Sequence, residues 1–287
     1  MILLNKFPEY LPGPVSVAYG SFDGMHAGHL SVLRTLSTER GSTVLLSLTE
    51  PDSFILSTEE EKSCFAEKAG ISRMISIPRT RFKTLSAEAL IKRILVGKLH
   101  ASCIVTGDCD PNLPILLQLS VRYGFRVRTV PAEKFKSQVI SSETIQKELK
   151  ENDYPSACSM LGHGYFFKNT VIHGKGNGKK FGMPTANILL PERKILPTYG
   201  VYGSKVTING ESFLGVTNIG LRPSVDNSSV PTVETNILNF DRDIYGETMS
   251  LELCLFVRET LKFKNGLAEV KKQIEKDTQT VRTFFLD

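Results

Sequence analysis

Fifteen residues from His173 to Asn187 have a composition that suits phosphate binding. The segment reads His-Gly-Lys-Gly-Asn-Gly-Lys-Lys-Phe-Gly-Met-Pro-Thr-Ala-Asn, with four glycines and three lysines. Glycines let backbone N–H groups close on phosphate oxygens, and lysines neutralise the phosphate charge. The side-chain oxygens of Thr185 and Asn187 are neutral ligands of the kind that a phosphate-bound Mg²⁺ accepts. The segment therefore predicts a phosphate site that uses Mg²⁺.

A second candidate phosphate site is Gly20-Ser-Phe-Asp-Gly-Met-His-Ala-Gly-His29. It follows an expected strand and leads into an expected helix, so its glycines and imidazoles would face anions at a helix N-terminus. The alternative is an ordinary glycine-rich turn with incidental histidines. We favour the phosphate site because two histidines, two glycines and an aspartate coincide in a strand-to-helix context. The residues assigned to this site are Gly20, Phe22, Asp23, Gly24, His26, Gly28 and His29.

Short apolar runs alternate with helix-like stretches in the first half of the chain. The expected strands are 15–19, 43–47, 74–77, 103–106 and 126–130, and the expected helices are 30–36, 59–69, 87–95 and 114–123. This alternation predicts a parallel sheet with helices on both faces, whose ligands lie beyond the carboxyl ends of the strands. A further helix is expected over 141–153, with Ser141 or Ser142 as its N-cap and Tyr154-Pro155 at its end.

The second half changes to strands separated by turns. The expected strands are 200–207, 213–216, 232–240 and 250–257, and Asn209-Gly210 is a strong hairpin signal between the first two. Residues 266–285 space their apolar side chains in a helical period. We therefore predict a small antiparallel barrel or sandwich with one terminal helix, and two domains at 1–155 and 160–287.

Composition narrows the possible partners. The 287 residues carry a formal charge of +5 and contain no run of five or more Lys or Arg, which favours anionic small molecules over nucleic acid. The oligomeric state is left open. No apolar run approaches the ~18 residues that span a bilayer, so we expect a cytoplasmic protein without membrane contact. Five scattered cysteines without a C-x-x-C pair indicate reduced, mostly buried thiols rather than disulfides or a zinc site.

Two sets of motifs resemble known families. The histidines of the 20–29 motif resemble the H-x-G-H signature of nucleotidylyl transferases, in which both imidazoles contact ATP phosphates. The 173–187 segment, with Tyr199-Gly-Val-Tyr202, Asn218-Ile-Gly-Leu-Arg-Pro223 and Pro231-Thr-Val-Glu234, resembles riboflavin kinase. The whole chain resembles the bacterial bifunctional riboflavin kinase/FAD synthetase family, which converts riboflavin to FMN and FMN to FAD.

The resemblance implies a fold, ligands and residue roles. It implies a Rossmann-like nucleotidylyl transferase sheet followed by a riboflavin-kinase-like β-barrel, with riboflavin, FMN, ATP and ADP as ligands and Mg²⁺ accompanying ATP. It assigns Thr185 and Asn187 to Mg²⁺ and phosphate, Glu234 to the catalytic base, and Ser141 and Ser142 to the nucleotide of the first half. The residues that it assigns to the kinase ATP loop are Gly174, Gly176, Gly178, Lys179 and Gly182.

The first half departs from the family pattern at three places. The family's Gly-Asp-Asp-Phe-x-Phe-Gly-x-x-Arg-x-Gly appears as Gly107-Asp-Cys-Asp-Pro-Asn-Leu-Pro114, and its Phe-x-Pro-His-Pro as Leu48-Thr-Glu-Pro-Asp52. Its Ile-Ser-Ser-Thr-x-Ile-Arg appears as Ile140-Ser-Ser-Glu-Thr-Ile-Gln146. If the N-terminus of the 141–153 helix faces the β and γ phosphates, Glu143 adds repulsion and Gln146 removes a charged donor, each at a cost of about 1–3 kcal/mol.

Three functions follow from these observations. The first is a riboflavin kinase whose FMN adenylyltransferase half is impaired. The second is a fully bifunctional enzyme that also makes FAD from FMN and ATP. The third is a non-catalytic regulator that senses flavin or nucleotide. Thr185, Asn187 and Glu234 together argue against the third for the second half of the chain.

Overall fold

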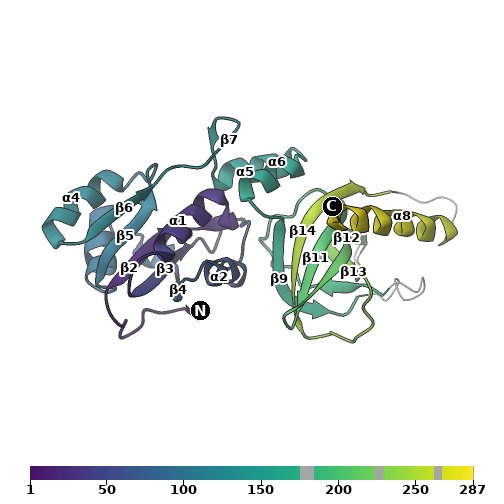
Figure 1. Ribbon diagram of the computed structural model, residues 1–287, viewed down its shortest axis with the longest axis horizontal. Helices are drawn as coiled ribbons and strands as arrows, with labels where there is room; N and C mark the ends of the chain where they lie inside the picture. Colours follow the sequence, from purple (N-terminus) through teal and green to yellow (C-terminus); the bar gives the residue numbers. More distant parts are fainter. Residues whose placement is uncertain (175–183, 224–228, 262–266, 287) are drawn as a thin grey trace. The chain divides into compact units, whose positions relative to one another are not determined.

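The computed structural model describes residues 1–174, 184–223, 229–261 and 267–286, and the chain divides into two compact units, Met1–Thr144 and Ile145–Asp287. The first unit is built on a six-stranded sheet in the order β1-β4-β3-β2-β5-β6, and all of its pairings are parallel (Figure 1). The strands are β1 (Ile2–Leu4), β2 (Val15–Gly20), β3 (Ser42–Thr49), β4 (Arg73–Pro78), β5 (Ala101–Gly107) and β6 (Arg126–Val130). The predicted parallel sheet is confirmed, and β1 is an edge strand that the sequence pattern did not reveal.

Helices pack on this sheet. They are α1 (Ala27–Ser37), α2 (Glu59–Lys68), α3 (Ala87–Leu90), which continues as the π-helix η3 (Ile91–Val96), and α4 (Leu113–Tyr123). One face of the sheet buries Val17, Val44 and Ile75 in a cluster with Ile91 of η3 and Leu116 of α4. Shorter elements are η1 (Asp23–Met25), η2 (Arg79–Phe82), and the hairpin of β7 (Lys134–Phe135) and β8 (Gln138–Val139).

Two helices, α5 (Ser142–Lys150) and α6 (Tyr154–Leu161), lead toward the strands of the second half. We expected Tyr154-Pro155 to end the first of them, but it opens the second. Proline is tolerated in a first helical turn, where its missing N–H has no intrahelical partner. Asp153 caps α6, because its carboxylate accepts the N–H of Ser156 at 3.0 Å.

The second unit contains a closed antiparallel barrel in the order β10-β13-β12-β11-β14-β9 (Figure 1). Its strands are β9 (Tyr165–Ile172), β10 (Ala186–Ile188), β11 (Gly200–Ile208), β12 (Glu211–Pro223), β13 (Ser229–Ile237) and β14 (Thr248–Glu259). Asn209 and Gly210 connect β11 and β12 with φ angles of 50° and 82°, which suit the predicted two-residue hairpin. The barrel, one of the two predicted alternatives, is therefore confirmed.

The inner and outer faces of the barrel have different chemistry. A chain of fully buried hydroxyls runs across the inside, with Ser204 to Thr217 at 2.8 Å and Thr217 to Thr235 at 2.9 Å. The terminal helix α8 (Leu267–Leu286) packs on the outside, where Val281 is buried in a cluster with Val201 and Val216. Side chains alternate between the two faces of a strand, so the neighbours of Thr217 and Thr235 in sequence face outward.

The five cysteines form no disulfide, but they are less buried than expected. Only Cys103 is buried, and Cys109 is exposed. Cys109 follows β5 at the carboxyl edge of the sheet, where the chain leaves the core. None of the helices in the described ranges is long and apolar enough to cross a membrane.

Replacing Thr217 by Val should lower the free energy of unfolding by about 1–3 kcal/mol, because Thr235 then loses a buried hydroxyl partner. Urea denaturation followed by circular dichroism measures the effect. Thr207→Val, on the less buried outer face of β11, is the control and should change stability by less than about 0.5 kcal/mol. Equal stabilities of the two variants would show that the inner hydroxyl chain contributes nothing.

Candidate functional site

A cavity of about 770 Å³ lies in the first unit at the carboxyl edge of the parallel sheet. At this edge β2 and β5 are neighbours in the sheet. From β2 the chain continues through β3 and β4 in one direction across the sheet, and from β5 it continues to β6 in the opposite direction. Ligands of open parallel sheets bind where the strand order reverses in this way. The residues assigned from the sequence that line the cavity are Gly20, Phe22, His26, Gly28, His29, Ser141 and Ser142.

The two imidazoles of the motif are stacked beside each other on the cavity wall. The His26 and His29 ring centroids are 3.6 Å apart with 22° between the planes. His26 also caps α1, because its Nδ1 accepts the backbone N–H of His29 at 3.4 Å. A methyl group at Gly28 would lie 3.2 Å from the His26 ring, so glycine allows the ring to sit this close to the helix. Because Nδ1 of His26 accepts a hydrogen bond, the proton of the neutral His26 imidazole is on Nε2, which can act as a donor.

Burial lowers the pKa of His29 well below its ordinary value near 6.5, and the nearby His26 and Lys62 lower it further. His29 is therefore neutral at neutral pH. The unfolded chain binds the proton more readily than the folded chain does, so this group makes the first unit less stable as the pH falls below about 6.5.

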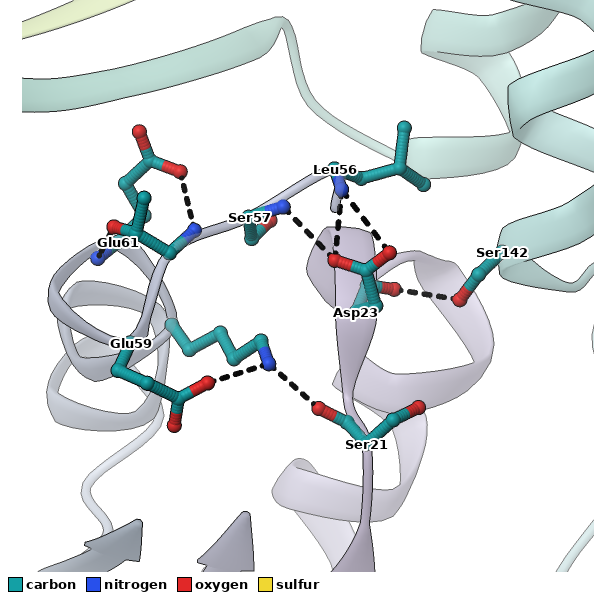
Figure 2. A network of polar contacts seen from close by, with 9 residues as sticks. Ser21, Asp23, Leu56, Ser57, Glu59, Glu61 and Ser142 are labelled. Atoms are coloured by element: carbon teal, nitrogen blue, oxygen red, sulfur yellow. Dashed lines mark hydrogen bonds and ion pairs between the residues drawn. The ribbon is translucent and has the colours of Figure 1, made fainter. Parts of the chain in front are cut away.

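Asp23 does not line the cavity but ties the motif to the connection between β3 and α2. Its carboxylate accepts the N–H of Leu56 at 2.9 and 3.0 Å and that of Ser57 at 2.9 Å. Its backbone carbonyl accepts the hydroxyl of Ser142 at 2.8 Å. Figure 2 shows Asp23 between Leu56 and Ser57 on one side and Ser142 on the other. Asp23 and Gly24, both assigned to the nucleotide from the sequence, therefore lie behind the cavity wall, where Asp23 positions the motif.

A buried lysine supports the same loop from α2. Lys62 Nζ donates to the carbonyl of Ser21 at 2.8 Å and pairs with Glu59 at 2.7 Å. Phe22 and Met25 adopt left-handed φ angles of 49° and 47°, which cost about 1 kcal/mol or more each for residues with side chains. The contacts of Asp23 and Lys62 hold the loop in this strained conformation.

The N-terminus of α5 forms another part of the cavity wall. Ser141 is the N-cap, because its Oγ accepts the N–H of Thr144 at 3.2 Å while Thr144 Oγ1 accepts the N–H of Ser141 at 3.0 Å. This resolves the choice between the two serines. Glu143 also lines the cavity, so the cavity that contains both histidines also carries a carboxylate at a helix N-terminus.

The sequence analysis missed a polar cluster after β5. Asp110 accepts the hydroxyl of Thr106 at 2.6 Å, the N–H of Asn112 at 2.8 Å and the hydroxyl of Tyr19 at 3.4 Å. Burial raises the pKa of Tyr19, and Asp110 adds to the effect. All four residues line the cavity. The altered 107–114 segment therefore places a carboxylate in the cavity.

Two basic residues that the sequence analysis did not single out also line this cavity. They are Arg79, which pairs with Glu50 at 3.5 Å, and Lys83. Their only sequence signal is the basic run that follows β4 at the same sheet edge.

A second cavity, of about 370 Å³, lies in the second unit. Thr185 and Pro184 line it together with Phe240, Arg242 and Tyr245. The guanidinium of Arg242 is held by Glu211 at 2.9 Å and stands 4.9 Å from the centre of the Phe240 ring. The cavity therefore has one hydroxyl-bearing wall and one wall with aromatic and charged groups.

Asn187 and Glu234 lie side by side on the outer face of the barrel. They are directly paired in the register of β10 and β13, and directly opposed residues of antiparallel strands share a face with Cβ atoms about 4.5–5.5 Å apart. Asn187 is buried and Glu234 is half-buried. A methyl group at Gly174 would lie 2.4 Å from Asn187 Nδ2, so only glycine fits beside this amide.

The structure thus brings Gly174, Thr185, Asn187 and Glu234 to one region of the barrel. The other residues assigned to the kinase loop, Gly176, Gly178, Lys179 and Gly182, lie outside the described residues. Within the described ranges, no group of three or more His, Cys, Asp or Glu residues could hold a metal ion. Neutral oxygens such as those of Thr185 and Asn187 fit a cation that takes most of its ligands from phosphate and water.

Two family models match the chain. The model described as FAD synthetase matches residues 10–144, and the model described as riboflavin kinase matches residues 161–285.

Curated relatives from three bacteria match over nearly their whole length, and each is described as a bifunctional riboflavin kinase/FMN adenylyltransferase. The relative from Haemophilus influenzae is 33% identical over 94% of this chain and 94% of its own length. The relative from Listeria monocytogenes is 33% identical over 94% and 92%. The relative from Escherichia coli is 30% identical over 93% and 91%.

A solved structure resembles nearly the whole chain. It is titled as a macrolide-efflux protein from Streptococcus pneumoniae, and it matches with a TM-score of 0.80 over 98% of this chain and 99% of that chain. Its sequence is 23% identical, so this likeness concerns the fold alone.

Replacing Asp23 by Ala should increase hydrogen exchange at the amides of Leu56 and Ser57 by about tenfold or more, because both lose a charged acceptor worth about 1.5–3 kcal/mol. Hydrogen–deuterium exchange with mass spectrometry measures this. Asp52→Ala removes an exposed carboxylate from the same connection and is the control. Unchanged exchange in Asp23→Ala would mean that the carboxylate does not hold this connection.

Proposed function

We propose that this chain, which belongs to the bifunctional riboflavin kinase/FMN adenylyltransferase family, phosphorylates riboflavin to FMN and transfers AMP to FMN only weakly. The kinase activity is assigned to residues 160–287 and the adenylyltransferase activity to residues 1–155. The matches of the two family models to separate halves of the chain support this division.

The kinase proposal rests on the pairing of Asn187 with Glu234 close to the Thr185 cavity. The 5′-hydroxyl of the ribityl chain is a weak nucleophile, so transfer needs a group that takes its proton. In the proposed mechanism Glu234 accepts this proton, the alkoxide oxygen attacks the γ-phosphorus of ATP, and ADP leaves. The outer face of β13 supports this role, because it carries the half-buried Glu234 carboxylate beside Asn187, its partner in register.

Nucleotide binding is assigned to the cavity beside Thr185. Thr185 lines this cavity directly before β10, and Asn187 follows two residues later on the outer face of β10. They would hold Mg²⁺, which neutralises charge on the phosphates during transfer. The aromatic wall of the 370 Å³ cavity, with Phe240 and Tyr245, suits a nucleobase.

The weak adenylyl transfer is proposed because Glu143 lines the first cavity. Glu143 and Asp110 are two of the four carboxylates, with Glu50 and Glu133, that line a cavity whose histidines would contact a triphosphate. Like charges repel most strongly where water is partly excluded. The altered 107–114 segment also places Asp110 where the family carries residues that help to hold flavin and ATP.

Full bifunctionality is the second candidate function. The stacked histidines and the capped α5 support it, because both retain the geometry that a nucleotide site needs. The relatives that match over nearly the whole chain also carry both activities in their descriptions. A non-catalytic regulator would make neither product.

Glu234→Gln should lower the rate of FMN formation by about 10² or more, because the amide cannot accept the proton. Riboflavin binding, followed by flavin fluorescence, should stay nearly unchanged. Glu192→Gln, an exposed carboxylate in the same unit, is the control and should keep the parent rate. A Glu234→Gln rate within a few-fold of the parent would remove Glu234 from the role of base.

Glu143→Thr, alone and with Gln146→Arg, should raise the rate of FAD formation from FMN and ATP by about tenfold or more. The change removes a repulsion worth about 1–3 kcal/mol and restores a charged donor. Chromatography of the flavins measures this rate. FMN formation from riboflavin serves as the internal control and should not change. An unaltered rate of FAD formation would show that these two positions do not limit adenylyl transfer.

A further inference from the structure

Asn218 occupies a place on the barrel that the proposed mechanism has not used. It is paired with Glu234 in the register of β12 and β13, just as Asn187 is paired with Glu234 in the register of β10 and β13. Cross-strand partners share a face. Asn187, Glu234 and Asn218 therefore form one row across three strands, with the carboxylate between two amides.

The opposite face confirms the orientation of this row. Thr217 and Thr235 precede and follow the row residues on their strands, and their hydroxyls meet inside the barrel at 2.9 Å. Because alternate side chains point to opposite faces, Asn218 and Glu234 both point out of the barrel. Asn218 is exposed and Glu234 is half-buried, so a ligand from solvent can reach both.

The neighbours of Asn218 leave space on one side only. Val216 and Val201 on the same outer face are buried under α8 with Val281. Gly220 lies two residues further along β12, and a methyl group there would be 3.5 Å from Asn218 Nδ2. The Asn218 amide therefore stands at the edge of the surface that α8 covers, beside a position that carries no side chain.

We propose that Asn218 is a positioning residue of the kinase site: with substrate bound, its amide N–H would donate to the Glu234 carboxylate, its partner in register, and so aim the other carboxylate oxygen at the substrate hydroxyl. A carboxylate has two oxygens, and a general base uses only one of them to accept the proton. A donor on the second oxygen fixes the direction of the first. Asn187 is assigned to the metal and phosphate side, so Asn218 is the amide available on the flavin side.

The surroundings of Glu234 make this inference testable by pH. The described residues that flank Glu234 on this face are Asn187, Asn218, Thr232 and Asn236, and none of them is charged. The row continues from Asn218 to Val201 of β11 and then to Arg258 of β14. Arg258 is therefore three strands from Glu234, which is about 14 Å because neighbouring strands lie about 4.8 Å apart. It is paired with Asp277 of α8 at 2.7 Å, so the two charges offset each other.

The decisive variant is Asn218→Asp, tested by the pH profile of riboflavin phosphorylation in single turnover. A second carboxylate opposite Glu234 opposes its ionisation, so the acid limb of the profile should move to higher pH by about one unit. Asn218→Ala should lower the single-turnover rate by about fivefold to tenfold, because the Glu234 carboxylate is no longer oriented toward the substrate hydroxyl. The ATP concentration that gives half of the maximal rate should change by less than about twofold.

Ser212→Asp is the matched control. Ser212 lies six residues along β12 on the same face, about 20 Å from Asn218 at about 3.4 Å per residue, and it is exposed. It adds the same charge to the same strand, so its acid limb should stay where the parent has it. An equal displacement in Asn218→Asp and Ser212→Asp would attribute the effect to net charge and overturn the inference.

The inference rests on the proposed kinase function, and the two fail in different ways. If the parent protein forms FMN but both Asn218 variants keep its rate and pH profile, Asn218 has no positioning role and the kinase proposal stands. If the folded parent protein forms no FMN from riboflavin, ATP and Mg²⁺, the kinase proposal fails and the inference fails with it. If the acid limb of the pH profile moves in Asn218→Asp and the single-turnover rate falls in Asn218→Ala, both the kinase proposal and the role of Asn218 are supported.

Discussion

The antiparallel register of β10, β13 and β12 is the constraint on which the proposed kinase site depends. It opposes Asn187, Glu234 and Asn218 in one row and, one residue along, brings Thr217 and Thr235 together inside the barrel. A slip of one residue would turn the carboxylate into the core and the hydroxyls outward. The buried hydroxyl chain and the proposed site are therefore fixed by the same strand register, on opposite faces of the strands. The hydrogen bonds of the hydroxyl chain stabilise this register and so maintain the geometry of the proposed site.

The first unit holds its motif in a different way, by a few polar contacts around a strained loop. Asp23 and Lys62 bind backbone groups from separate segments, and both lie behind the cavity rather than in it. The motif assigned to a nucleotide from the sequence thus lies at a cavity whose wall also carries Glu143 and Asp110. The proposal that the two activities differ rests on this combination of a positioned motif and acidic groups on the cavity wall.

The sequence predicted what depends on local patterns. Runs of β-branched residues located β2 to β6, the Asn209-Gly210 pair located a hairpin, and the serines before α5 located its cap. Local patterns did not predict contacts between residues far apart in the sequence. Examples are the pairing of β10, which is three residues long, and the cluster of Tyr19 with Asp110. Pro155 was misjudged because proline suits a first helical turn as well as a helix end. The roles of Gly174, Thr185, Asn187 and Glu234 came from the family resemblance and stay predictions.

The most direct test of the account follows the flavins over time in two incubations of the purified protein with ATP and Mg²⁺, one started from riboflavin and one from FMN. The account predicts that FMN accumulates in the first and that FAD appears far more slowly in both. FAD formed from FMN at a rate near that of FMN formation would contradict the weakened adenylyltransferase. The absence of FMN from the riboflavin incubation would contradict the kinase assignment itself.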